Sequence, residues 1–292
     1  MTPAVERHGQ GDVYTVNGLP ILYEDNHIIS VVKKPGVLSQ ADGSGAPDML
    51  SLIKSDIAER YDKPGNVFLG LVHRLDRNVG GTMVFARTSK GASRLSEELR
   101  KKRFYKAYLA VTDCPCQTES GFLINDLYKD EVRNQVFEDK KRGKRSVLWY
   151  QTLQTAKARS LLLVYPITGR SHQIRAQLAI SGHPLKGDMK YGDSGKISTA
   201  LGLWSSVIIV KHPTQDKLLQ ITSVPPEDGP WKLFDSSAYD FVKERLAPEN
   251  IIEKYEEGQA LSLIHISSFE ILSVEENVRK NDASGMYRIL EN

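Results

Sequence analysis

Short apolar runs alternate with segments of helical periodicity along the chain, and this pattern predicts interleaved strands and helices. Continuous or alternating apolar residues are typical of buried strands. The predicted strands are Ile21–Tyr23, His27–Val32, Thr82–Ala86, Tyr105–Val111, Val147–Leu153 and Leu161–Pro166. A chain of 292 residues is long enough to bury the core of one large α/β domain, with or without an appendage.

Apolar side chains at helical spacing predict three helices. The first spans Asp48–Tyr61, with Asp48 as its N-cap. The second begins at Ser89 as its cap, and it ends in a basic cluster. The third spans His172–Ser181 and ends at Gly182, because a proline follows closely.

The segment Gly70–Arg87 is predicted to be the chemical centre of the chain. It reads as a turn between two apolar segments, and four polar residues crowd into that turn: His73, Arg74, Asp76 and Arg77. Gly80 and Gly81 then give the backbone freedom for a tight entry into the strand. A carboxylate at the mouth of a buried strand is costly unless a cation meets it.

Arg175 is the cation that we expect to meet this carboxylate. In the third helix Ile174, Leu178 and Ala179 define the buried stripe, and Arg175 lies three and four residues from the latter two. Its guanidinium therefore points toward the core or its edge, where it needs a carboxylate. We predict that Asp76 pairs with Arg175.

Charge is distributed unevenly along the sequence. The segment from Asp235 to the end holds 6 Lys and Arg against 12 Asp and Glu, a net charge of −6. Residues 1–234 therefore carry a net charge of +9, and the whole chain carries +3. Two basic clusters, Arg100–Lys106 and Lys140–Arg145, lie in this body. We expect them to contact phosphates of a polyanion, and the alternative is a solvated helix end and a solvated hairpin tip.

The composition, 40% hydrophobic and 26% charged, is that of an ordinary globular chain. It shows no membrane-spanning apolar run and no signal-peptide pattern, so we expect a cytoplasmic protein without a membrane partner. Cys114 and Cys116 are interpreted as reduced thiols. A metal site is one alternative function for His73, Asp76, His172, His183 and Asp188. We expect no metal, because no helical His-x-x-x-His spacing occurs and arginines interleave these residues.

Several motifs together resemble the RluA family of pseudouridine synthases. The family's opening motif resembles Ile21–Asp25 through Lys34-Pro35. The later motifs follow in the family's order: His73-Arg74-Leu75-Asp76 with Gly81, Lys106–Ala110, Thr168–Arg175, Gly182–Asp188 and Tyr191-Gly192. The resemblance covers about Leu19 to Phe234. It implies a single α/β (α+β type) domain with a long mixed, mostly antiparallel sheet and an active-site cleft across its middle.

The resemblance also implies an activity, the isomerisation of uridine in RNA to pseudouridine without metal or organic cofactor. By analogy Asp76 is the catalytic carboxylate, attacking the sugar or removing its 2′ proton, and Arg175 keeps it ionised. Tyr108 stacks on the target base, and Arg74 takes the space of the extruded nucleotide. The residues assigned to substrate binding are His73, Arg74, Arg170, His172, Lys101, Lys102 and Arg103.

Two positions depart from the family pattern. Val79-Gly80 stands where Thr-Ser is usual, and Lys33 stands where asparagine often precedes Lys-Pro. These departures leave the RNA target open. We expect a monomer acting on ribosomal RNA, with transfer RNA as the alternative substrate. A non-catalytic RNA-binding module is the alternative from another class, but such a module would need neither Asp76 nor Arg175.

The domain organisation predicted from these patterns has three parts. Residues 1–18 form a flexible arm, residues 19–234 form the catalytic domain, and residues 235–292 form an acidic tail that we expect to be dispensable. Leu261–Ser267 resembles the translation of a transposon-end adapter used in DNA library preparation. We therefore predict a non-native sequence from about residue 261.

Overall fold

The computed structural model describes residues 4–9, 11, 13–192 and 200–263, and residues Met1–Ser262 belong to one compact unit. Its described strands form a single 12-stranded sheet. They are β1 (Ala4–His8), β2 (Ile21–Glu24), β3 (Ile28–Lys33), β4 (Gly70–Leu71), β5 (Gly80–Ala86), β6 (Tyr105–Val111), β7 (Ser120–Asp130), β8 (Gln135–Glu138), β9 (Lys144–Ala156), β10 (Arg159–Pro166), β11 (Leu203–Lys211) and β12 (Lys217–Thr222).

The sheet is mixed and mostly antiparallel, as predicted. Its main path runs β2-β3-β5-β11-β6-β10-β9-β7-β8, with β4 beside β5 and β12 joining β11 to β1. Among the named strands of the described residues, only β1 with β12 and β5 with β11 pair in parallel. The chain therefore folds as a mixed α/β domain, and strands distant in sequence meet at its centre.

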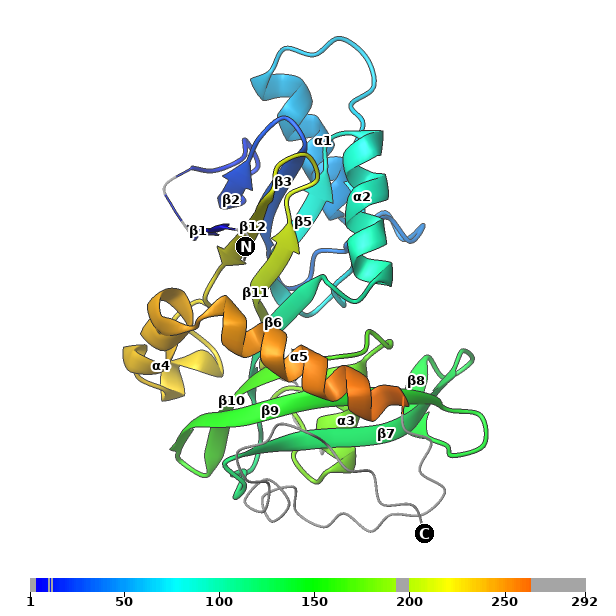
Figure 1. Cartoon of the computed structure of the whole chain (residues 1–292), viewed down its shortest axis with the longest axis vertical. Coiled ribbons are helices and arrows are strands. Elements are labelled where there is room, and N and C mark those ends of the chain that lie inside the picture. Colours follow the sequence, from blue (N-terminus) through cyan, green and yellow to red (C-terminus); the bar gives the residue numbers. More distant parts are fainter. Residues whose placement is uncertain (1–3, 10, 12, 193–199, 264–292) are drawn as a thin grey trace, which may run out of the picture. The chain divides into compact units, whose positions relative to one another are not determined.

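Helices cover both faces of this sheet (Figure 1). They are α1 (Met49–Arg60), α2 (Ser89–Arg100), α3 (Gln173–Ile180), α4 (Ser236–Asp240) and α5 (Pro248–Leu263), with a 3-10 turn at Trp231–Leu233 and a π turn at Phe241–Arg245. Buried residues of α1 and α3 share one core with Tyr108 of β6. Those of α2, α4 and α5 share the opposite core with Leu109, as the alternation of side chains along a strand requires.

Gly80 and Gly81 allow β11 to approach β5 at the centre of the sheet. A Cβ atom at Gly80 would lie 2.4 Å from the ring of Trp204, and one at Gly81 would lie 2.3 Å from the carbonyl oxygen of Ser205. Gly81 also has a φ of +115°, which side-chain-bearing residues rarely adopt. The paired glycines therefore permit both the strand contact and the tight entry expected from the sequence.

The sequence-based elements agree with the structure in type but not everywhere in extent. Asp48 caps α1 and accepts a hydrogen bond from the backbone of Ser51. The cap of α2 is Thr88 and not Ser89, since its hydroxyl accepts from the backbone of Gly91. Strands β1, β4, β7, β8, β11 and β12 were not assigned from the sequence. In β11 every residue from Leu203 to Val210 is buried, so no alternation marks its faces.

Two segments outside the predicted catalytic domain contribute to the compact unit. Ala4–His8, in the expected flexible arm, pairs with β12 as a parallel strand. Residues 235–262 add α4, the π turn and most of α5, which bury Tyr239, Val242, Ile251 and Tyr255. The three-part division stays a prediction. The packing of residues 235–262 against the core is, however, not what a dispensable tail would show. From residue 264 onward, the segment predicted to be non-native lies outside the described residues.

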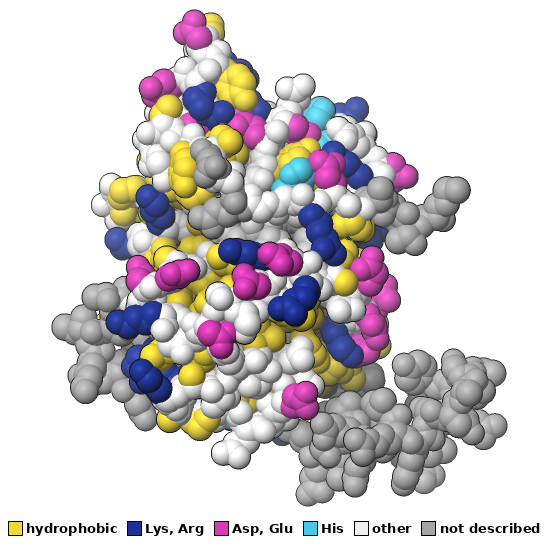
Figure 2. Space-filling model, turned by 90° about the vertical axis from the view of Figure 1, so that its left-hand side faces the viewer, with side chains coloured by type: hydrophobic (Ala, Val, Ile, Leu, Met, Phe, Trp, Pro, Cys, Tyr) yellow, Lys and Arg dark blue, Asp and Glu magenta, His cyan; other side chains and the backbone are white. Residues whose placement is uncertain are grey.

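Figure 2 shows one side of the molecule in space-filling form, with basic and acidic side chains next to one another. No uniformly basic area is visible on that side, so the net positive charge of the body is not gathered there. None of the described helices is long and apolar enough to cross a membrane.

A chain that ends at Ser237 is expected to unfold at a markedly lower temperature than the parent. Each large apolar side chain removed from the core contributes about 1.5–3 kcal/mol. Five are lost, Tyr239, Val242, Leu246, Ile251 and Tyr255, and a typical domain is stable by only about 5–15 kcal/mol. Thermal unfolding followed by circular dichroism measures the effect. The control is a chain ending at Leu263, which keeps α5, and equal melting of both chains would contradict the packing role of residues 238–263.

Candidate active site

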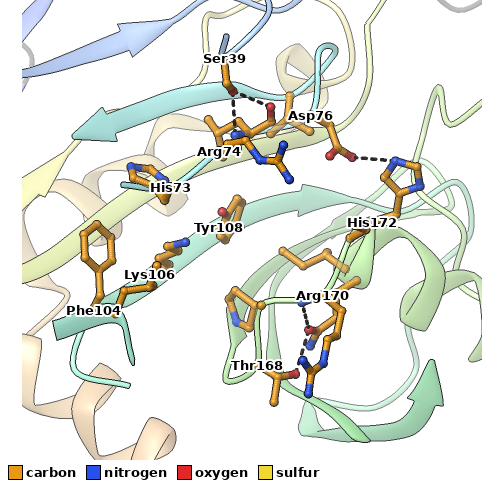
Figure 3. A pocket seen from close by; sticks show the side chains of 18 of the residues that line it. Ser39, His73, Arg74, Asp76, Phe104, Lys106, Tyr108, Thr168, Arg170 and His172 are labelled. Carbon is orange, nitrogen blue, oxygen red and sulfur yellow. Dashed lines mark hydrogen bonds and ion pairs between the residues drawn. The ribbon is translucent and has the colours of Figure 1, made fainter. Parts of the chain in front are cut away.

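A cavity of about 1000 Å³ lies beside residues 72–76, which directly follow β4. Its walls come from the loop 38–42, the segment 71–76, the start of β6, the segment 166–175 that leads into α3, and Tyr255 of α5. In Figure 3 the side chains of Arg74, Asp76, Tyr108 and His172 surround the same space. The structure thus brings together segments that lie more than a hundred residues apart in sequence.

Asp76 begins a tight turn that leads into β5. The backbone N–H of Val79 donates to the carbonyl of Asp76 at 3.0 Å, which closes the turn. On its N-terminal side the hydroxyl of Ser39 donates to the carbonyl of Leu75 at 2.7 Å and accepts from the Leu75 N–H at 3.0 Å. The backbone beside Asp76 is therefore fixed, while its side chain, 31% exposed, faces the cavity.

Arg175 links two carboxylates from different parts of the chain. Its Nη1 donates to Oδ2 of Asp76 at 2.9 Å, as the sequence predicted. Its Nε and Nη2 each donate to a different oxygen of Asp188 at 2.8 Å. This bidentate arrangement is the stronger geometry, and the Asp188 side chain is fully buried. Asp188 thus orients the guanidinium, which in turn orients Asp76.

Electrostatics favour the ionised forms of Arg175 and Asp188. Burial opposes the charge of Arg175, but its hydrogen bonds to Asp188 and Asp76 raise its pKa above the ordinary value. Burial likewise opposes ionisation of Asp188, yet Arg175 and the backbone N–H groups of Lys190 and Tyr191 hold its pKa below the usual range. One arginine and two carboxylates leave one net negative charge, and Asp76 is the exposed member that presents it.

His172 lies on the other side of Asp76 (Figure 3). Its Nε2 is 3.7 Å from Oδ2 of Asp76, and its Nδ1 is hydrogen-bonded to the hydroxyl of Tyr191 at 2.8 Å. Burial lowers the pKa of His172, while Asp76 opposes this effect. The imidazole is therefore held at the edge of the cavity by Tyr191, which also accepts a hydrogen bond from the backbone of Val136.

Tyr108 and Lys106 project from the same face of β6 into the cavity (Figure 3). Burial raises the pKa of Tyr108, so its hydroxyl stays protonated at neutral pH. Burial lowers the pKa of Lys106 to about 8, and its amino group lies 5.3 Å from the centre of the Phe104 ring. Tyr255 holds this end of β6 by hydrogen bonds with both the N–H and the carbonyl of Lys106.

The remaining predicted cavity residues have different surroundings. His73 is buried, and its Nε2 accepts a hydrogen bond from the backbone of Val84 at 3.0 Å, so it supports β5. Arg74 is exposed at the cavity, and Arg170 is exposed with its guanidinium donating to the carbonyl of Arg145 at 3.4 Å. The contact brings Arg170 next to the second basic cluster. Substrate binding by these residues stays a prediction.

The first basic cluster is only partly free to meet a polyanion. Lys101 forms an ion pair with Glu97 at 2.6 Å, and Arg103 pairs with Glu98 at 2.6 Å. Lys102 has no carboxylate partner among the described residues, and it lines the cavity. Lys102 and the buried Lys106 are therefore the described residues of this cluster that line the cavity without a carboxylate partner, and Lys102 is the exposed one.

The hypothesis of a metal site finds no matching geometry. Among the described residues no group of three His, Cys, Asp or Glu side chains is arranged to hold a metal ion. His73 uses Nε2 for the backbone of Val84, and Asp188 uses both oxygens for Arg175.

Several residues of the site were not singled out from the sequence. Asp188 belonged to a motif but was not predicted to hold Arg175, and neither Ser39 nor Tyr255 was considered. No local pattern marked Asp188, because it lies 13 residues from Arg175 and its burial arises only in the folded chain. Ser39 and Tyr255 act through backbone contacts across 36 and 149 residues, which no local pattern reveals.

Comparisons with known proteins agree with this fold. A sequence model described as RNA pseudouridylate synthase matches residues 27–180, which include both Asp76 and Arg175. The uncharacterized RNA pseudouridine synthase YhcT of Bacillus subtilis is 30% identical over 72% of this chain and 70% of its own. The ribosomal large subunit pseudouridine synthase D of Xylella fastidiosa is 32% identical over 72% of this chain and 67% of its own.

Solved structures show the same fold. Human RNA pseudouridylate synthase domain containing 1 superposes with a TM-score of 0.61 at 19% identity, covering 84% of this chain and 98% of the human one. The chain belongs to the RNA pseudouridylate synthase family and is of the RluA type. It is an RNA pseudouridine synthase, an isomerase, as the motifs led us to expect.

Replacing Lys102 by methionine is expected to weaken RNA binding and flatten its salt dependence. One lost phosphate contact changes the slope of log K against log salt by about 0.7–0.9. Lys101→Met is the matched control, and its effect should be smaller because Glu97 already neutralises that charge. Binding is measured by filter retention at several salt concentrations. Equal slopes for Lys102→Met and the parent would show that this residue contacts no phosphate.

Proposed function

We propose that this chain converts uridine to pseudouridine in ribosomal RNA of the large subunit, with Asp76 as the catalytic carboxylate. The observation that supports this role is the arrangement of its two oxygens. Oδ2 is hydrogen-bonded by Arg175, whereas Oδ1 accepts no hydrogen bond among the described residues and lies at the cavity. An oriented carboxylate with one free oxygen can act as a nucleophile or as a base.

The charge distribution suits the cleavage of a glycosidic bond. Breaking the bond between uracil and ribose develops positive character on the sugar, and a fixed negative charge nearby stabilises it. Asp76 presents the net negative charge of its group with Arg175 and Asp188, so no reorganisation of solvent is required. The free oxygen then attacks the sugar or removes its 2′ proton, and both routes require an ionised Asp76.

Other cavity residues have roles in the handling of the base. Tyr108 offers an aromatic ring next to Asp76, and its hydroxyl is protonated, so it can stack on uracil and donate a hydrogen bond. Arg74 is exposed at the cavity and long enough to fill the space that an extruded nucleotide leaves. His172 and Arg170 border the opposite wall, where we assign them to substrate binding.

The ribosomal substrate is supported by the name of the Xylella relative, which is a ribosomal large subunit enzyme. Transfer RNA is the alternative substrate. A monomeric state, a cytoplasmic location and the absence of a membrane partner stay predictions.

Asp76→Asn is expected to reduce pseudouridine formation by at least about 1000-fold, as the loss of an essential catalytic group does. The protein should still bind RNA, because asparagine keeps the shape of the side chain but has neither charge nor basicity. Tritium release from uridine labelled at the ring carbon that becomes bonded to the sugar measures the reaction.

Asp216→Asn is the matched control, since its carboxylate is 85% exposed on the turn between β11 and β12. This control should keep full activity. Circular dichroism separates lost chemistry from lost fold in both variants. Folded Asp76→Asn with activity within about tenfold of the parent would exclude Asp76 as the catalytic group, since removing such groups costs far more.

Deleting the gene from its natural host is expected to remove one or a few pseudouridines from large-subunit ribosomal RNA. Chemical mapping of pseudouridine across ribosomal and transfer RNA, with and without the gene, measures this loss. Restoring the gene should return the modification, and restoring the Asp76→Asn form should not. A loss confined to transfer RNA would support the alternative substrate.

A further inference from the structure

Lys33 is fully buried at the end of β3, directly behind the turn that carries Asp76. Its side chain has no exposed surface, and in the sheet it lies opposite Gly81. The amino group donates to the carbonyls of Arg77 and Val79, both at 2.8 Å, and to its neighbour Lys34 at 3.2 Å. An ammonium group has three N–H donors, so every donor is used.

A buried lysine whose partners are only neutral carbonyls is uncommon, because such a charge is costly away from water. Burial lowers the pKa of Lys33 to about 7, while the nearby charge of Asp76 opposes this effect and Arg77 adds to it. Among the described residues no carboxylate lies within ion-pair distance of the Lys33 amino group. The structural role of Lys33 follows from the carbonyls that accept its hydrogen bonds.

Two of the acceptors belong to the turn that begins at Asp76. Arg77 and Val79 are its second and fourth residues, and the turn is closed by the N–H of Val79 on the carbonyl of Asp76. The Arg77 carbonyl also accepts from the N–H of Gly36 at 2.8 Å. Lys33 therefore holds the C-terminal side of this turn, while Ser39 holds its N-terminal side.

We propose that Lys33 is a positioning residue of the active site, which fixes the Asp76–Val79 turn through its carbonyls and places a second positive charge near the Asp76 carboxylate. This inference rests on the proposed role of Asp76. Asparagine, which often stands at this position in the family that the chain resembles, has no charge and two donors on a shorter side chain. The chain thus supports its catalytic turn with a group of different chemistry.

Lys33→Met tests this role because methionine has a similar length without donors or charge. We expect the single-turnover rate on a large-subunit ribosomal RNA transcript to fall by about 10- to 100-fold, since a displacement of about 1 Å can cost this much. RNA affinity should stay within twofold of the parent value, as Lys33 does not line the cavity. Lys54→Met, an exposed lysine of α1, is the matched control and should keep the parent rate.

The pH profile separates positioning from general packing. The protonated amino group holds the turn, so the parent's rate should fall as pH rises through the pKa of Lys33, and Lys33→Met should lack this decline. The charged groups that face Lys33 are Asp76 and Arg77. Lys106 lines the cavity and burial lowers its pKa to about 8, so it titrates in the same window in both proteins, and the test is the difference between the two profiles. His172, whose pKa lies below its ordinary value, titrates on the acid side of this window.

Each outcome decides between the proposals. A slow Lys33→Met that is folded, binds RNA and lacks the parent's decline near the pKa of Lys33 supports the positioning role. A folded Lys33→Met with the parent's rate and profile overturns it, and if Asp76→Asn is inactive the proposed function still stands. If Lys33→Met does not fold, Lys33→Gln, which keeps an amide donor without a charge, is judged by the same criteria. An active, folded Asp76→Asn would instead reject the proposed function itself.

Discussion

The pairing of Arg175 with two carboxylates is the interaction on which the geometry of the site depends. Arg175 and Asp188 lie largely away from water, and such burial is tolerable only when each charge meets a partner in good geometry. Asp188 is completely buried and accepts two hydrogen bonds from the guanidinium of Arg175. These two bonds fix the plane of the guanidinium and therefore the direction in which Nη1 points. That direction fixes Asp76, which is 99 residues away in sequence. The orientation of the Asp76 carboxylate at the cavity is therefore a product of the folded sheet and not of the local turn.

The turn itself needs support from its backbone, because a side chain oriented by one hydrogen bond can still move with its loop. Ser39 bonds to both polar groups of Leu75, and Lys33 bonds to the carbonyls of Arg77 and Val79. The strand that follows can begin so close to β11 only because Gly80 and Gly81 lack side chains. The backbone around Asp76 is thus restrained on both sides, and the fixed charge of the site requires this rigidity.

How far the sequence predicted the site depends on the range of each contact. The Arg175–Asp76 pair followed from local periodicity, since an arginine beside a buried helical stripe needs a carboxylate. The second partner, Asp188, lies in a loop without periodicity, and its burial shows only in three dimensions. Lys33 stood out as a departure from a motif, but the sequence did not show that its side chain points into the protein, because a lysine at a strand end is usually exposed. Strand β11 escaped prediction since burial on both faces removes the alternation that identifies a strand.

The acidic C-terminal region illustrates why charge alone is a weak guide to domain boundaries. Glutamates of α5 contribute to the net negative charge of residues 235–292, yet the helix buries Ile251 and Tyr255 against the same core as β6. Helix α5 also passes so near Ile167 that a Cβ atom at Gly258 would lie 2.5 Å from that side chain. Tyr255 lines the cavity and holds the backbone of Lys106. A helix can direct its charged side chains toward solvent and its apolar stripe toward the core. The net charge of a segment therefore describes its solvent-exposed face, whereas its buried apolar stripe determines whether it belongs to the domain.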